Sequence, residues 1–172
     1  MSAREKILNG IAINQPELVA LPVMDMNVII SYPDVFEQFK MMMQSIGGKV
    51  ELVSNISVLK ERLIADKASG NFVINAIANL GELDSQVASF TASELEKVER
   101  AYIKGTIGAA ENGAIWIYES QMINRLLPFI CQHLILVIDK KNIVPTMHQA
   151  YDSIEVANEG FGAFIAGPSK TA

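Results

Sequence analysis

The chain has 172 residues and a formal net charge of −5; half of its residues are apolar and 19% are charged. This composition is that of a globular protein with a sizeable core, and it excludes a disordered chain. Because lysines and arginines are scattered through an acidic sequence, no basic face for nucleic acid is expected, and no apolar run reaches the roughly 18 residues of a transmembrane helix.

The N-terminal half predicts alternating helices and strands. Ser2 and Glu5 have capping-box spacing, so a helix should open an N-terminal helix-and-arm segment at about residues 1–26. Asp34 precedes a helix with a clear apolar face, which Gly47-Gly48 ends. The other elements expected here are a helix capped by Ser54 or Asn55 and strands at Asn27–Ser31, Lys49–Val53 and Phe72–Ile77.

The C-terminal half continues the pattern after a polar stretch whose element boundaries are not evident. The expected strands are Ala101–Ile103, Ala114–Tyr118, His133–Asp139 and Gly162–Ala166. The expected helices are Gln121–Leu127 and one that starts with Pro145 as its first residue. Strand–helix alternation and near-continuous apolar runs are typical of parallel strands buried on both faces. We therefore predict one α/β domain over residues 1–172, with a mainly parallel sheet and helices on both faces.

The segment from Gly105 and Thr106 to Gly113 is the first candidate for chemistry. Small residues surround Glu111, and Asn112-Gly113 follows it before an apolar strand. Asn-Gly favours a tight turn with positive φ, so one interpretation is a β-hairpin connection with Glu111 at its shoulder. The other is that the small residues leave space for a ligand, which Glu111 faces as a general base or nucleophile.

The second candidate is the C-terminal stretch Gly167-Pro168-Ser169-Lys170-Thr171, directly after a predicted strand. Its backbone N–H groups, hydroxyls and lysine could bind an anion, since open α/β sheets bind ligands at the carboxyl ends of their strands. The alternative is a solvated turn. The segment does not have the spacing of a phosphate-binding P-loop.

Metal ligands are scarce. His133, His148 and Cys131 are the only histidines and the only cysteine. They cannot supply a closed zinc site or a four-cysteine iron–sulfur cluster, so no metal or other cofactor is expected in this chain. A single cysteine and the absence of a signal-peptide pattern at the N-terminus predict a cytoplasmic location.

Four motifs resemble the LUD-domain family, which includes lactate-utilisation protein C. Ala110-Glu111-Asn112-Gly113 resembles the family's Ala-Glu-(Thr/Asn)-Gly segment, and Asn142-Ile143-Val144-Pro145 resembles its Ile-Val-Pro stretch. Arg125-Leu126-Leu127-Pro128 with His133 is similar to its Arg-x-x-x-x-Pro-x-x-His region, with shorter spacing. The most specific match is Gly167-Pro168-Ser169-Lys170-Thr171-Ala172, similar to Gly-Pro-Ser-(Arg/Lys)-Thr-Ala. The resemblance runs from about Val35 onward and is strongest after Gly105.

This resemblance implies a fold like that of the ribose-phosphate isomerase and CoA-transferase superfamily (NagB/RpiA/CoA-transferase-like). It also implies a role beside iron–sulfur subunits that oxidise lactate to pyruvate. Family members normally continue with an acidic stretch and a further glycine-containing segment, whereas this sequence stops at Ala172. Either the C-terminal part is missing from this sequence or this member is short.

Two functions from different classes follow. The first is a cluster-free accessory subunit of a lactate-oxidising complex, whose partners carry the iron–sulfur clusters. The second is a stand-alone enzyme or binding protein for an anionic acyl, CoA or phosphorylated small molecule. Some CoA transferases use a nucleophilic glutamate in Ser-Glu-Asn-Gly, which Glu111-Asn112-Gly113 resembles. In that hypothesis Ser169, Lys170 and Thr171 hold the anion. The sequence leaves the oligomeric state open.

Overall fold

A computed structural model describes residues 2–20, 22, 30–155, 157 and 159–167. Its helices are α1 (Ala3–Ile13), α2 (Val35–Ser45), α3 (Ile56–Ala68), α4 (Ala92–Leu95), α5 (Glu119–Met122), α6 (Leu127–Ile130) and α7 (Met147–Asp152). Its strands are β1 (Val73–Asn75), β2 (Arg100–Lys104), β3 (Ile107–Ala109), β4 (Ala114–Tyr118), β5 (His133–Val137), β6 (Ile143–Val144) and β7 (Gly162–Ile165). None of the described helices is both long and apolar enough to cross a membrane.

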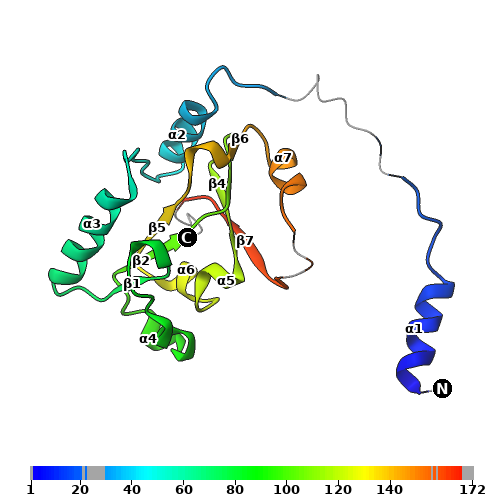
Figure 1. Cartoon of the computed structure of the whole chain (residues 1–172). Coiled ribbons are helices and arrows are strands. Elements are labelled where there is room, and N and C mark those ends of the chain that lie inside the picture. Colours follow the sequence, from blue (N-terminus) through cyan, green and yellow to red (C-terminus); the bar gives the residue numbers. More distant parts are fainter. Residues whose placement is uncertain (1, 21, 23–29, 156, 158, 168–172) are drawn as a thin grey trace.

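Helix α1 begins at the predicted capping box. The Ser2 hydroxyl accepts the Glu5 N–H at 3.2 Å, and the Glu5 carboxylate accepts the Ser2 N–H at 2.6 Å. No residue of α1 is buried, and the helix stands clear of the sheets (Figure 1). The predicted strand Asn27–Ser31 falls mostly outside the described residues, and its last two residues, Ile30 and Ser31, lie in no strand.

The predicted α/β class with mainly parallel pairing is confirmed. Strands β1, β2 and β5 form a parallel sheet in the order β1-β2-β5. Helix α3 covers one face, where Leu59 and Leu63 pack against Tyr102; α4, α5 and α6 cover the other. The predicted strand Lys49–Val53 is wrong, because this segment pairs with no described strand. Val50 packs against the cluster of Phe39 and Val53 against that of Leu59 and Leu63, whereas Leu52 is 63% exposed.

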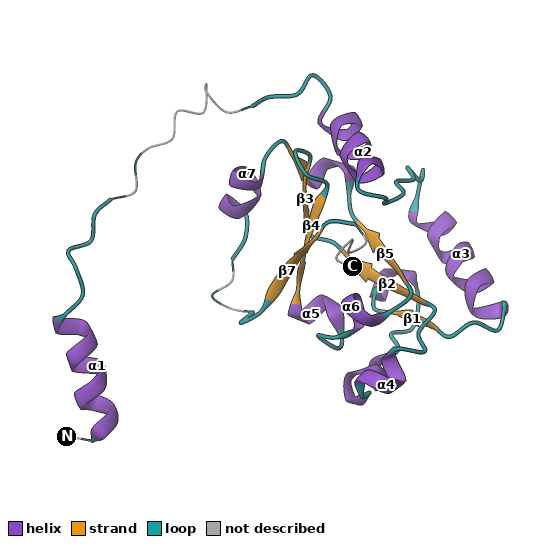
Figure 2. Cartoon of the chain, turned by 180° about the vertical axis from the view of Figure 1, so that it is seen from behind, coloured by secondary structure: helices purple, strands orange, loops and turns teal. Residues whose placement is uncertain are grey.

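A second sheet, in the order β6-β3-β4-β7, lies beside the first (Figure 2). Strand β6 pairs with β3 in parallel, whereas β3 with β4 and β4 with β7 are antiparallel. Strand β3 was not expected from the sequence, because Gly and Ala, two of its three residues, are depleted in strands. The predicted strand at Gly162–Ala166 is present as β7.

The predicted helix Gln121–Leu127 is two short helices instead. Ile123 has a φ of 60°, a left-handed conformation that ends α5 after one turn. Pro128 lies inside α6 rather than after a helix, in the first turn, where its missing N–H costs no hydrogen bond. Helix α7 likewise starts with Met147 after the Thr146 cap, so Pro145 precedes the helix and is not its first residue.

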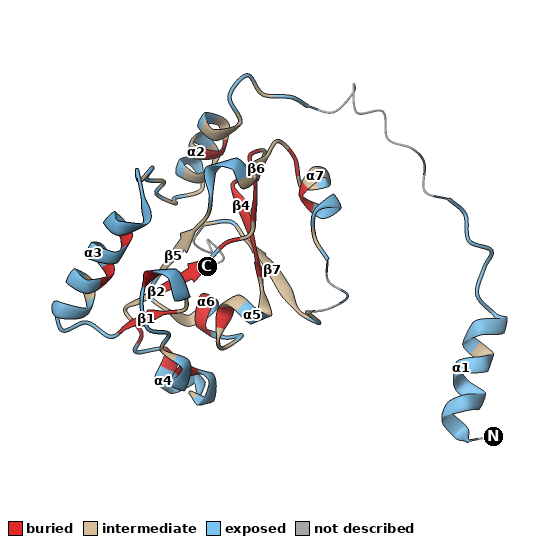
Figure 3. Ribbon diagram, in the orientation of Figure 1, coloured by how far each residue is buried: buried red, intermediate tan, exposed pale blue. Residues whose placement is uncertain are grey.

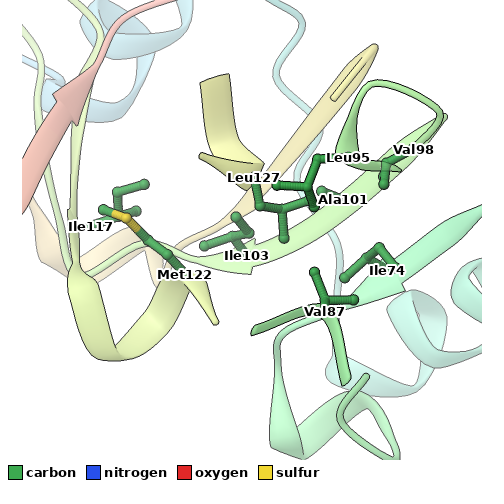
Figure 4. Close-up of a cluster of buried hydrophobic side chains, with 9 residues drawn as sticks. All are labelled: Ile74, Val87, Leu95, Val98, Ala101, Ile103, Ile117, Met122 and Leu127. Atoms are coloured by element: carbon green, nitrogen blue, oxygen red, sulfur yellow. The ribbon is translucent and has the colours of Figure 1, made fainter. Parts of the chain in front are cut away.

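The largest apolar cluster joins the two sheets (Figure 4). Ile103 of β2 and Ile117 of β4 are both fully buried in it, with Met122 and Leu127 from the two short helices. Its other members are Ile74, Val87, Leu95, Val98 and Ala101. The core therefore fixes the mixed sheet on the parallel sheet, and with it the hairpin that carries Glu111.

Candidate functional site

The first candidate segment is the β3–β4 hairpin. The Gly113 N–H donates to the Ala109 carbonyl at 2.9 Å, and the Asn112 side chain accepts the Ala114 N–H at 3.0 Å. Gly113 has a φ of 73°, which other residues adopt only with strain. The hairpin interpretation of Asn112-Gly113 is therefore correct, and a role of these two residues in ligand binding stays a prediction.

Glu111 is half-buried on this turn and joins it to α7. Its Oε1 atom accepts the backbone N–H of Met147, the first residue of α7, at 2.7 Å. Its own N–H donates to the Pro145 carbonyl at 3.0 Å. The first N–H groups of a helix have no partner within the helix, so this carboxylate satisfies one of them. Glu111 thus has a structural role that the sequence did not reveal.

This contact predicts different effects for two substitutions. Glu111→Ala should lower the free energy of unfolding by about 0.5–2 kcal/mol, because the Met147 N–H loses its acceptor. Glu111→Gln keeps an oxygen that can accept the Met147 N–H. It should lower the free energy of unfolding by about 0.3–1 kcal/mol, because the negative charge at the start of the helix is removed. Urea unfolding of both variants measures the difference. An alanine variant as stable as the native protein would contradict the role.

One glycine of each candidate segment packs against the C-terminal end of α2. A Cβ atom on Gly113 would lie 3.1 Å from Cγ of Met43, and one on Gly167 would lie 2.9 Å from Cγ1 of Ile46. Ile46 is the cap residue of α2, one turn after Met43. The structure therefore brings the Glu111 turn and the start of the C-terminal stretch to one place. Pro168, Ser169, Lys170 and Thr171 lie outside the described residues.

Gly105 and Thr106 lie where the chain crosses from the parallel sheet to the mixed sheet. The Gly105 N–H donates to the Val137 carbonyl at 2.8 Å, and a Cβ on Gly105 would be 2.5 Å from Cγ2 of Ile115. The Thr106 hydroxyl donates to the Gln121 side chain at 2.9 Å. Neighbouring side chains fill the space beside these small residues, so the described contacts explain them by packing; their role in ligand binding remains a prediction.

The remaining polar groups give no metal site within the described part of the chain. No group of three or more His, Cys, Asp or Glu side chains there could hold a metal ion. His133 lies 3.5 Å from the Glu99 carboxylate at the surface, and His148 is exposed. Burial raises the pKa of the Cys131 thiol to about 11, so this thiol is protonated and unreactive at neutral pH.

A partly buried charged cluster around Asp66 was missed in the sequence. The Asp66 carboxylate accepts hydrogen bonds from the Arg100 guanidinium and, at 2.5 Å, from the Tyr102 hydroxyl. Burial, together with this hydrogen bond, raises the pKa of Tyr102 above its ordinary value, so the phenol stays protonated and donates. The signal was available: Asp66 shares a helix face with Leu59 and Leu63, and a carboxylate on an apolar face needs a partner. The cluster ties α3 to β2.

Comparisons with known proteins agree with this fold. Residues 99–172 match the family model described as the LUD domain, which confirms the resemblance to that family. The chain is also similar to a DUF162 family protein from Deinococcus radiodurans, known from a 1.70 Å crystal structure. The TM-score is 0.63 and the identity 21%, over 81% of this chain and 90% of that chain, so the likeness shows the fold alone. No curated protein matches the sequence.

Proposed function

We propose that this chain, with its LUD domain match at residues 99–172, is a cluster-free accessory subunit in the oxidation of lactate to pyruvate in the cytoplasm. The family match is the observation that carries the proposal. An iron–sulfur cluster needs several cysteine thiolates, and the whole sequence holds one cysteine. Electrons from lactate would therefore pass through clusters in partner subunits, which this chain would bind.

Two segments that carry family motifs, the Glu111 turn and the start of the C-terminal stretch, lie together at the C-terminal end of α2, which supports a functional surface there. Glu111 lies two residues before Gly113, and the Ser169-Lys170-Thr171 segment begins two residues after Gly167. Because Gly113 and Gly167 contact side chains one helical turn apart, the end of the first family motif and the start of the second lie in the same part of the fold. A partner or ligand bound at this end of α2 would lie beside the Glu111 turn and Gly167.

An affinity pull-down of the full-length chain from cells grown on lactate tests the subunit hypothesis. Mass spectrometry and an iron assay on the eluate should find iron–sulfur proteins, and deletion of the gene should impair growth on lactate but not on glucose. An iron-free eluate, with normal growth on lactate and no second copy of the gene, would count against this function.

The position of the Glu111 turn beside Gly167 also favours a second candidate function. In this alternative the chain is an enzyme or binding protein for an anionic acyl, CoA or phosphorylated small molecule. Glu111 would be the nucleophile or base, and Gly167, Ser169, Lys170 and Thr171 would bind the anion. A substrate panel with the native protein and Glu111→Gln tests it. The glutamine variant keeps the acceptor for Met147, so lost turnover in a folded variant would indicate chemistry at the carboxylate. Equal turnover would remove Glu111 from the mechanism.

A further inference from the structure

Strand β5 is an apolar strand at the edge of the parallel sheet. Leu134 and Leu136 pack into the cluster between the sheets, and Ile135 and Val137 pack on the opposite face beside α3. Such uninterrupted apolar sequence is typical of parallel strands covered on both faces, and both faces of β5 are covered here. Its outer edge is different: β5 ends the order β1-β2-β5, and no described residue pairs with that edge. Its apolar residues are only half-buried, whereas the centre of β2 is buried (Figure 3).

The contacts at each end of β5 show which of its backbone groups have no partner among the described strands. The His133 N–H donates to the Glu99 carbonyl at 2.9 Å, and the Val137 carbonyl accepts the Gly105 N–H at 2.8 Å. Backbone groups alternate in direction along a strand, so the N–H and C=O groups of Leu134 and Leu136 point away from β2. The run Leu134–Val137 contains no charge and no proline, the residues that normally protect an exposed edge from pairing.

We infer that this edge is a homodimer interface, in which β5 pairs antiparallel with β5 of a second copy across a twofold axis. Full overlap places Ile135 opposite itself and Leu134 opposite Leu136 of the second copy. Each Leu134–Leu136 pair then exchanges both N–H···O bonds, which uses the four groups left open on each copy. The two parallel sheets become one continuous sheet.

The strand is self-complementary, which favours a second copy as its occupant. The pairing places His133 opposite Val137 and Cys131 opposite Asp139, so no like charges meet. A twofold contact of this kind gives a closed dimer, whereas edge contacts without a twofold axis can continue from copy to copy into a filament. A standard interface buries about 800 Å² per partner, more than one strand edge supplies. Leu126 and Phe129, at the helix that leads into β5, are 45% and 57% exposed and add apolar surface from both copies.

A disulfide cross-link tests the register. Residue 135 would form a non-hydrogen-bonded pair with itself, with Cα atoms about 4.5 Å apart, which suits a disulfide. In a Cys131→Ser background, Ile135→Cys should give a covalent dimer on mild oxidation. The matched control is His133→Cys in the same background, whose two copies would lie about 14 Å apart and should stay uncrosslinked. Equal cross-linking of both, or of neither, would overturn the proposal.

The native chain provides a test that needs no substitution. Sedimentation should show a dimer that dissociates on dilution. Hydrogen exchange should show the Leu134 and Leu136 amides protected in the dimer and exchanging faster on dilution, while the Ile135 amide, paired with β2, stays protected in both states. A chain that is monomeric at all concentrations overturns the proposal, whether or not these two amides are protected.

Discussion

The Ile117→Ala variant is expected to lose about 2–5 kcal/mol of free energy of unfolding, the range for large-to-small changes in a packed core. Ile117 is fully buried where β4 meets the parallel sheet, beside Ile103 and Met122 (Figure 4). Both sheets surround the site and limit how far it can collapse, so a cavity should remain. The loss is a large part of the stability of a domain of this size.

Urea unfolding followed by circular dichroism measures this loss, and Ile64→Ala is the matched control. Ile64 lies on the solvent side of α3 and is 67% exposed. The same change in side chain should alter stability there by no more than about 0.5 kcal/mol. Similar losses in the two variants would mean that the contact between the sheets is not a packed core.

The second large effect is expected at Asp66. Asp66→Ala should cost about 2–3 kcal/mol, because the buried Tyr102 hydroxyl and the Arg100 guanidinium both lose their acceptor. The value lies below that of a fully buried ion pair because the Arg100 side chain is 36% exposed and can turn to solvent.

A double-mutant cycle separates the hydrogen bond from the ion pair. Tyr102→Phe alone should cost about 1 kcal/mol, since Asp66 keeps Arg100 as its partner. If the bond at 2.5 Å is formed, Tyr102→Phe should cost less in the Asp66→Ala background than in the native chain. Additive effects would show that the two side chains do not interact in solution.

Local chemistry explains the features that were predicted correctly. The capping box at Ser2 and Glu5, the cap at Asp34 and the Asn112-Gly113 turn each depend on residues within a few positions of one another. The parallel sheet followed from alternation of apolar strands and helices, because parallel strands need long crossovers. Family resemblance added the motifs around Glu111 and Gly167, although not their positions relative to each other.

The errors arose where contacts between distant segments decide the structure. Lys49–Val53 looks like a strand, but a strand needs a neighbour, and none of the described strands lies beside it. Ile-Gly-Ala at β3 looks like a loop, yet pairing with both β4 and β6 makes it a strand. The helix expected at Gln121–Leu127 breaks at Ile123 because two short helices fit the core between the sheets.

The sequence alone determined the α/β class, the turn at Asn112-Gly113 and the lack of cysteines for a cluster, since these depend on composition and on neighbouring residues. Only the tertiary structure decided that Glu111 accepts the first N–H of α7, that Gly113 and Gly167 both contact the C-terminal end of α2, and that β5 lies at an edge. The physical reason is distance along the chain. Each of these contacts joins residues far apart in sequence, and their partners are chosen by packing of the whole domain.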